Sequence, residues 1–158
     1  MIIRKAKIED INGIAVIMFQ VSQIHYDNRS DIFKMKNEEE IREEIKEMIL
    51  NKEKDLLIVE KHSKIVGVLI YRIKHIKKHM NIKDSKIIWI EELGVSEEYR
   101  RQGIGRILMK ELKKIAKKAN CQRIELNCWE FNKNAIEFYE NQGMKAQRRI
   151  MEIDLDEQ

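Results

Sequence analysis

Two glycines, Gly103 and Gly105, stand directly in front of an amphipathic segment in a chain that has six glycines and no proline. Apolar residues recur at helical spacing through residues 104–119, which predicts a helix with one buried face. Residues 87–95 ahead of the glycines read as a strand. Glycines at such a junction indicate either a tight turn or a ligand that comes close to the main chain.

The remaining pattern predicts a mixed sheet in one globular domain, residues 1–158. Asn37 and Glu40 form a capping pair for a helix that ends near Lys52. A basic connection, residues 74–86, separates two of the strands. Antiparallel strands followed by a strand–helix–strand unit indicate an α/β (α+β) domain with a mostly antiparallel sheet flanked by helices. Strands are expected at residues 2–7, 56–60, 65–73, 87–95 and 123–128, with a last strand pair at 144–155, and further helices at 11–25 and 133–141.

Composition narrows the classes of partner. The chain has 31 basic and 27 acidic residues, so its net charge of +4 does not by itself require a polyanion. No apolar run is long enough to cross a bilayer and no apolar leader opens the chain, which predicts a cytoplasmic protein with no membrane partner. Cys121 and Cys128 have no metal-ligand spacing, so we expect reduced thiols and no metal site.

The turn itself suits an anion. If a helix begins at Gly103, the main-chain N–H groups of residues 101–106 are the unpaired donors at the positive end of its dipole. Arg100, Arg101 and Arg106 add charged donors around a phosphate. The alternative is a glycine turn in front of a packed helix, and spacing alone does not decide between the two readings.

Two blocks of residues resemble one family. Residues 100–105, Arg-Arg-Gln-Gly-Ile-Gly, match the R/Q-x-x-G-x-G/A signature of the GNAT superfamily of acetyl-CoA-dependent N-acetyltransferases. Residues 132–139, Asn-Lys-Asn-Ala-Ile-Glu-Phe-Tyr, match a second block of that family. The resemblance covers residues 87–155, whereas the N-terminal half matches only in layout. Met144 replaces a usual phenylalanine, and Ser96 stands near a position where proline is common.

The resemblance implies a GNAT-like fold and acetyl-CoA as cosubstrate. The pyrophosphate would lie against the glycine turn, with the pantetheine arm along the preceding strand. Family context assigns the basic charge of residues 100–118 to the cofactor and to a solvated helix face, so no nucleic acid is expected. A homodimer, often formed through the last strands, is also implied. The cofactor-binding residues carried over are Leu93, Gly94, Val95, Arg100, Arg101, Gln102, Gly103, Ile104, Gly105, Arg106, Asn132, Asn134, Ala135 and Tyr139.

The chemistry requires a base, because a primary amine of pKa about 10.4 is almost fully protonated at neutral pH. Glu91 and Glu92 lie on the strand ahead of the glycines, and regular alternation would send them to opposite faces. Glu91 is favoured because residues 90–93 resemble the Leu-Glu-Asp segment of spermidine/spermine acetyltransferases, where this glutamate binds or deprotonates the amine. Glu92 is the second candidate, and either carboxylate could instead be solvated.

The same resemblance makes Tyr139 the proton donor to the departing thiolate, the alternative being packing beside Phe138. Tyr26 and Asp27 align loosely with acceptor-contacting residues of the polyamine enzymes, although both could be ordinary loop residues.

The function expected from these residues is acetyl transfer to a primary amine, a small cationic one, by direct attack in a ternary complex. Two alternatives stay open. The first is a protein acetyltransferase that acts on N-termini or lysines, and the second is a non-catalytic acetyl-CoA-binding regulatory module.

Overall fold

The computed structural model describes residues 1–77 and 80–155, which form two compact units. The first unit, Met1–Asn127, contains the β-sheet. The second, Cys128–Gln158, contains the helix α4 (Lys133–Asn141). We describe each unit by itself.

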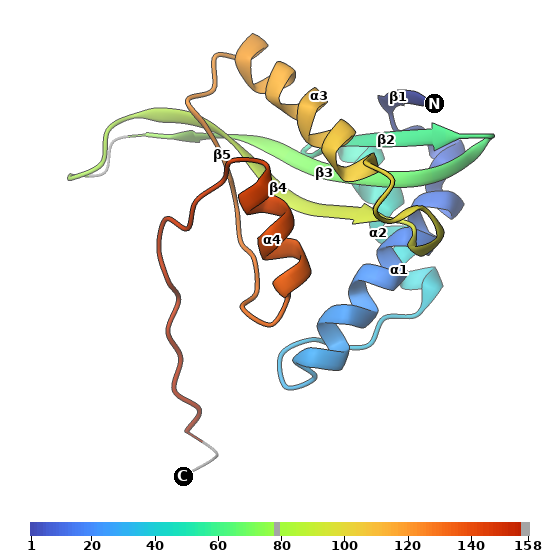
Figure 1. Ribbon diagram of the computed structural model, residues 1–158, viewed down its shortest axis with the longest axis horizontal. Helices are drawn as coiled ribbons and strands as arrows, with labels where there is room; N and C mark the ends of the chain where they lie inside the picture. Colours follow the sequence, from blue (N-terminus) through green and yellow to red (C-terminus); the bar gives the residue numbers. More distant parts are fainter. Residues whose placement is uncertain (78–79, 156–158) are drawn as a thin grey trace. The chain divides into compact units, whose positions relative to one another are not determined.

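The sheet of the first unit has five strands in the order of the sequence (Figure 1). All neighbours are antiparallel except β4 and β5, which are parallel and are joined by a helix. The predicted mixed sheet with one parallel strand–helix–strand unit is therefore confirmed. The strands are β1 (Ile2–Lys5), β2 (Asp55–Lys61), β3 (Lys64–Ile76), β4 (Ser85–Val95) and β5 (Arg123–Leu126).

Helices cover both faces of this sheet. The helices α1 (Ile11–Asn28) and α2 (Glu38–Asn51) pack on one face and α3 (Ile104–Lys118) on the other. The predicted cap of α2 is present, because Glu40 N–H donates to Asn37 Oδ1 and Asn37 N–H donates to Glu40 Oε2, both at 2.9 Å. This reciprocal pair satisfies two donors at the helix start.

Two glycines let helices approach the sheet closely. A Cβ at Gly67 of β3 would lie 2.6 Å from Ile104 Cγ2 of α3. A Cβ at Gly94 of β4 would lie 2.6 Å from Ile17 Cγ2 of α1. Real side-chain contacts are longer than this, so both positions require glycine for packing. The core beneath α1 and α2 consists of Ile14, Ala15, Ile17, Ile41, Ile45, Leu56, Ile58, Val68 and Ile70.

An ion pair fastens the N-terminal strand. The guanidinium of Arg4 on β1 makes two hydrogen bonds to Asp10, of 2.7 and 2.8 Å, and another of 2.8 Å to Glu60 of β2. Asp10 is buried, and the Arg4 hydrogen bonds hold the pKa of its carboxyl below the ordinary value. The stabilisation is therefore present at neutral pH and is lost as acid protonates the carboxylate.

The structure differs from the sequence prediction at two places. β3 and β4 extend to Ile76 and from Ser85, into the connection predicted at residues 74–86, of which residues 78 and 79 lie outside the described part. The predicted strand pair at 144–155 is wrong, because these residues form no strand in the described part of the second unit. Their apolar side chains alternate with acidic ones as in a strand, but a strand also needs a hydrogen-bonded partner. Ile150, Met151, Ile153 and Leu155 are exposed.

Among residues 1–77 and 80–155, no helix has the length and apolar character needed to cross a membrane.

Candidate active site

The glycine turn has the backbone of an anion site. Gly103 caps α3 in the left-handed region, with φ of 82°, and Arg101 has φ of 60°. After Arg100, whose N–H donates to Glu97 C=O, the main-chain N–H groups of residues 101–106 donate to no acceptor in the part of the chain that the structure describes. These donors point from a helix N-terminus, where negative charge is favoured.

The shape of the turn also suits a phosphate. A Cβ built on Gly103 would meet no atom within 4 Å, so the space beside this residue is open. Gln102 is fixed by a hydrogen bond from its side-chain amide to Glu98 C=O, of 3.1 Å, and by one from Lys61 Nζ, of 3.3 Å. The turn is therefore held in place without filling the open side, and its residues fit the pyrophosphate of a nucleotide cofactor.

Ahead of this turn, β4 has an edge that pairs with no strand among the described residues, and we call it the open edge. β4 pairs with β5 only as far as Ile90, opposite Leu126, although β4 continues to Val95. On the other edge, the N–H of Ser96, which directly follows β4, donates to the C=O of Val66 of β3. Because main-chain groups alternate along a strand, those of Leu93 and Val95 face the open edge, whereas those of Gly94 face β3.

A β-bulge in β4 changes the direction of the two glutamates. The register passes from Ile70 opposite Glu92 to Tyr71 opposite Ile90, so Glu91 is the extra residue. Glu92 shares the α1 and α2 face with Ile70. Glu91 reaches the same face, because its Oε1 lies 2.6 Å from Arg72 Nε, two residues beyond Ile70. The expectation that alternation separates the two carboxylates is therefore wrong, since a bulge interrupts alternation.

Glu92 is the most perturbed carboxyl of the described residues. Burial raises its pKa to about 7, and the nearby charge of Glu91 contributes in the same direction, whereas Lys36 opposes it. Lys36 lies in the segment between α1 and α2, where its ammonium also contacts both carboxylate oxygens of Glu44 at 2.8 Å. A carboxyl that titrates near neutral pH can take up a proton at the pH of the cell.

The residues predicted to contact the acceptor lie at the end of α1. Tyr26 and Asp27 belong to the last turns of this helix rather than to a loop. Asp27 accepts a hydrogen bond of 2.7 Å from the side chain of Gln23. Next to them, His25 stacks on Phe33, with 5.0 Å between ring centres, so the segment after α1 folds back on the helix.

The second unit holds the other predicted site residues on α4. Asn132 caps this helix, because its Oδ1 accepts a hydrogen bond of 3.2 Å from Ala135 N–H. The side-chain amide nitrogen of Asn132, and not the N–H of Ala135, is thus the donor suited to a ligand. Asn134 and Tyr139 follow on the helix, and the Tyr139 ring packs edge-on against Phe138, with 5.2 Å between centres.

Sequence reasoning missed two cations that the structure brings to the carboxylates, Arg72 and Lys36. No local motif marks either residue, because both are ordinary basic residues in a chain that has 31 of them. The strand alternation of β3 could have placed Arg72 on the face of Ile70, but its closeness to Glu91 depends on the register between β3 and β4.

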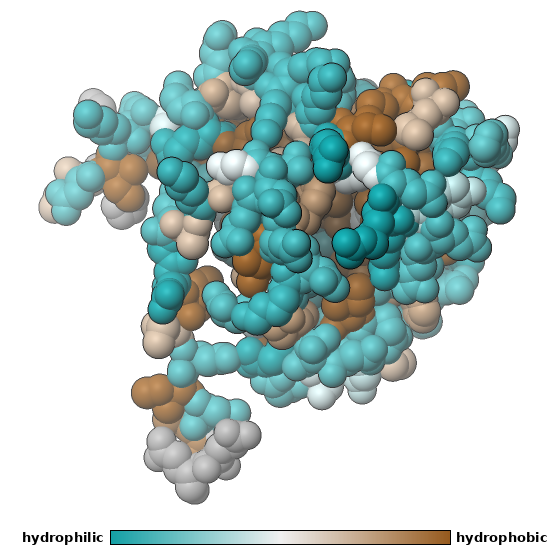
Figure 2. All heavy atoms as spheres, in the orientation of Figure 1, coloured by the Kyte–Doolittle hydropathy of each residue, from teal (hydrophilic) through white to brown (hydrophobic). Residues whose placement is uncertain are grey.

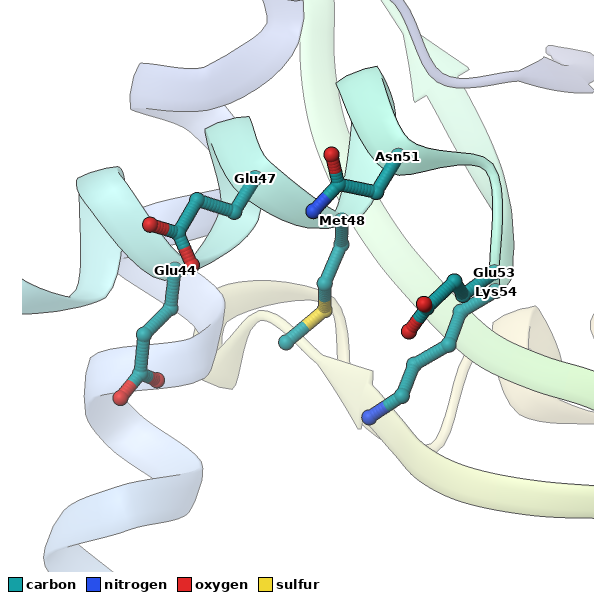
Figure 3. A pocket seen from close by; sticks show the side chains of 6 residues that line it. All are labelled: Glu44, Glu47, Met48, Asn51, Glu53 and Lys54. Carbon is teal, nitrogen blue, oxygen red and sulfur yellow. The ribbon is translucent and has the colours of Figure 1, made fainter.

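Two cavities lie away from these residues. One, of about 210 Å³, lies at the end of α2 and is lined by Glu44, Glu47, Met48, Asn51, Glu53 and Lys54 (Figure 3). The other, of about 600 Å³, lies between the start of α1 and the η2 turn (Glu97–Tyr99) and includes Ser96 and Tyr99. Neither includes a predicted catalytic residue. Hydrophilic residues cover most of the face shown in Figure 2.

Comparison with known proteins links this chain to one family by its sequence and to a solved structure by its fold. The model of the acetyltransferase (GNAT) family matches residues 19–144. A crystal structure of a mutant BH1408 protein from Bacillus halodurans superimposes with a TM-score of 0.92 and 28% identity, covering 98% of this chain and 99% of that one.

Two curated relatives match over shorter segments. N-alpha-acetyltransferase 60 of Xenopus tropicalis is 43% identical over 61 residues, which are 37% of this chain and 25% of the relative. L-ornithine N5-acetyltransferase of Arabidopsis thaliana is 40% identical over 58 residues, which are 37% of this chain and 25% of the relative. The chain thus spans about a quarter of the length of each of these relatives.

The raised pKa of Glu92 predicts a specific dependence of stability on pH. Between the ordinary carboxyl pKa of 4.5 and about 7, the folded protein keeps a proton that the unfolded chain has lost, so stability falls as pH rises through this window. In Glu92→Gln this fall should disappear. The free energy of unfolding of the variant, taken relative to that of the parent protein, should therefore be higher at pH 8 than at pH 5 by about 1 to 3 kcal/mol. Urea unfolding at both pH values measures this difference.

Glu97→Gln, at an exposed residue, is the control and should keep the pH dependence of the parent protein's stability. Identical pH dependence in all three proteins would contradict the burial of an ionisable Glu92.

Proposed function

This chain belongs to the acetyltransferase (GNAT) family, and on that basis we propose that it moves an acetyl group from acetyl-CoA to the primary amine of a small cationic molecule, by direct attack in a ternary complex. The observation that carries the proposal is the bulged strand β4, where two carboxylates on one face lie next to an unpaired strand edge and ahead of an anion-binding turn.

We assign the cofactor to the turn and the open edge. The N–H groups of residues 101–106 hold the pyrophosphate, with Arg100, Arg101 and Arg106 around it. Leu93 and Val95 offer main-chain groups to the pantetheine arm, as an added strand would use them. Asn132 and Asn134 of α4 contribute side-chain amides. Acetyl-CoA supplies the acetyl group as a thioester.

Side chains of the protein carry out the proton transfers. One of the two β4 carboxylates takes a proton from the ammonium, which leaves the amine with a free electron pair for attack on the carbonyl carbon. A nitrogen–carbon bond forms as the carbon–sulfur bond breaks. The N–H of Leu93 stabilises negative charge on the carbonyl oxygen. Tyr139 gives its proton to the sulfur, and the second proton, which the nitrogen loses as the amide forms, restores the phenol.

Negative charge near the expected acceptor favours a cation as substrate. Glu91, Glu92 and Asp27 carry carboxylates, and a protonated amine is attracted to such groups. The match to L-ornithine N5-acetyltransferase supports a small amine. The match to N-alpha-acetyltransferase 60 supports the second candidate, a protein or peptide N-terminus.

An acceptor screen tests the proposal. Free thiol released from acetyl-CoA is measured with polyamines, diamino acids, aminoglycosides and short peptides, against a reaction without acceptor. We expect release with a small polyamine or diamino acid. Release with peptides alone would replace the small amine by the second candidate. Tight acetyl-CoA binding without release in any reaction would show a non-catalytic binding module.

The cofactor site is tested by Gly105→Val. A branched side chain at the helix start should block the approach of the pyrophosphate and lower the affinity for coenzyme A by about tenfold or more in calorimetry. Lys110→Val places the same side chain on the exposed face of α3 and should leave the affinity unchanged. A folded Gly105→Val protein with the parent affinity would exclude the turn as the phosphate site.

The proton donor is tested by Tyr139→Phe, which removes one oxygen and keeps the ring against Phe138. A phenol of pKa about 10 can protonate a departing thiolate, so kcat should fall by roughly 100-fold while the Kd for acetyl-CoA changes little. Phe138→Leu serves as the control for altered packing. Near-parent kcat in Tyr139→Phe would assign this residue to packing.

A further inference from the structure

Arg72 of β3 forms an ion pair with Glu91 of β4 across the sheet. Its partner in the sheet register is Trp89, but its Nε lies 2.6 Å from Glu91 Oε1. Glu91 follows Trp89 by two residues and so lies on the same face as Arg72, and the bulge brings Glu92 to this face as well. Arg72 therefore meets the carboxylate that lies directly before Glu92.

The contact is an ion pair rather than an aligned hydrogen bond. Glu91 Oε1 is shielded from solvent and accepts no hydrogen bond of good geometry from any described residue, despite the short distance. Charge, and not a specific N–H direction, holds the two groups together. A lysine at position 72 could supply the same charge, whereas an uncharged side chain could not.

We propose that Arg72 is a positioning residue that holds the Glu91 carboxylate against β3 and so leaves Glu92 as the group that accepts the proton of the amine. This rests on the proposed function and deepens it by dividing the work of the two carboxylates. Glu91 already has a cation, so it attracts the acceptor less. Glu92 has no such partner on the sheet and accepts the proton.

The charges that face Glu92 come from three elements. Glu91 lies on its own strand, with Arg72 behind it on β3. Lys36, in the segment after α1, acts on Glu92 through its charge and forms an ion pair with Glu44 of α2. The part of α1 that covers β4 presents the apolar Ile17 and Val21, against Gly94, and the burial that results keeps Glu92 titrating near neutral pH.

The test follows the titration of Glu92 directly. The full chain is labelled with carbon-13 at glutamate carboxyls, and the Glu92 resonance is assigned by its loss in Glu92→Gln. In Arg72→Met, the charge of Glu91 is no longer opposed, so the midpoint for Glu92 should rise by about half a unit to one unit. Arg72→Lys should restore the parent midpoint. Arg123→Met removes a similar pair, with Glu125 on β5, and should leave Glu92 unchanged.

A second background shows whether Arg72 acts through Glu91. In Glu91→Gln, the added Arg72→Met change should shift Glu92 little, because the charge that Arg72 opposes is gone. An unchanged Glu92 midpoint in Arg72→Met, or an equal shift in both backgrounds, would overturn the proposal. These titrations need no substrate, so they stand apart from the acceptor screen.

Measurements of turnover at several pH values then test whether the titration of Glu92 governs catalysis. With the amine found in the screen, the acidic limb of kcat/KM in Arg72→Met should move to higher pH by the same amount as the Glu92 midpoint, and Arg72→Lys should restore it. A uniform loss at every pH would show a structural role only and would also overturn the proposal. If the titrations behave as expected and no amine reacts, the acetyltransferase proposal fails by itself.

Discussion

The β-bulge at Glu91 is the feature on which the candidate site depends. One extra residue in β4 brings Glu91 and Glu92 to the same face, and it falls directly after Ile90, the last residue of β4 that pairs with β5. The strand is thus redirected where its second edge becomes free. Bulges commonly re-aim side chains and end pairing in this way. A regular strand would carry one carboxylate on each face, so only half of this charge would lie on the face of α1 and α2.

Packing keeps the bulged strand in place. α1 and α3 press on the sheet at two glycines, Gly94 and Gly67, where any larger residue would collide with Ile17 or Ile104. A β-bulge interrupts the ladder and weakens it locally, so the surrounding contacts must supply the order that hydrogen bonds do not. Glu92 lies two residues from Gly94, beneath this close approach. The same packing therefore fixes the strand and shields much of Glu92 from water, which raises its pKa to about 7.

The sequence predicted the elements of the fold better than the local geometry of β4. Apolar periodicity and the Asn37 capping pair placed the helices and most strands correctly, because these signals act over a few neighbouring residues. The bulge was missed because it depends on the register between β3 and β4, and no residue type near Glu91 indicates a bulge. The strand pair at 144–155 was predicted from alternation alone, which indicates a face and not a partner. Motif resemblance named the glycine turn, and the structure adds its unpaired N–H groups and open side.

The arrangement along β4 also separates two kinds of charge. The end of the strand leads to the turn, where a helix N-terminus and three arginines favour anions. The bulge, only a few residues earlier, carries two carboxylates that favour cations. Between them lie Leu93 and Val95, whose main-chain groups face the open edge. Residues 91–95 are extended, at about 3.3 Å per residue, and this length separates the two carboxylates from the turn. This separation allows an anionic group and a cationic group to lie along the same strand without competing, since each is repelled from the position that attracts the other.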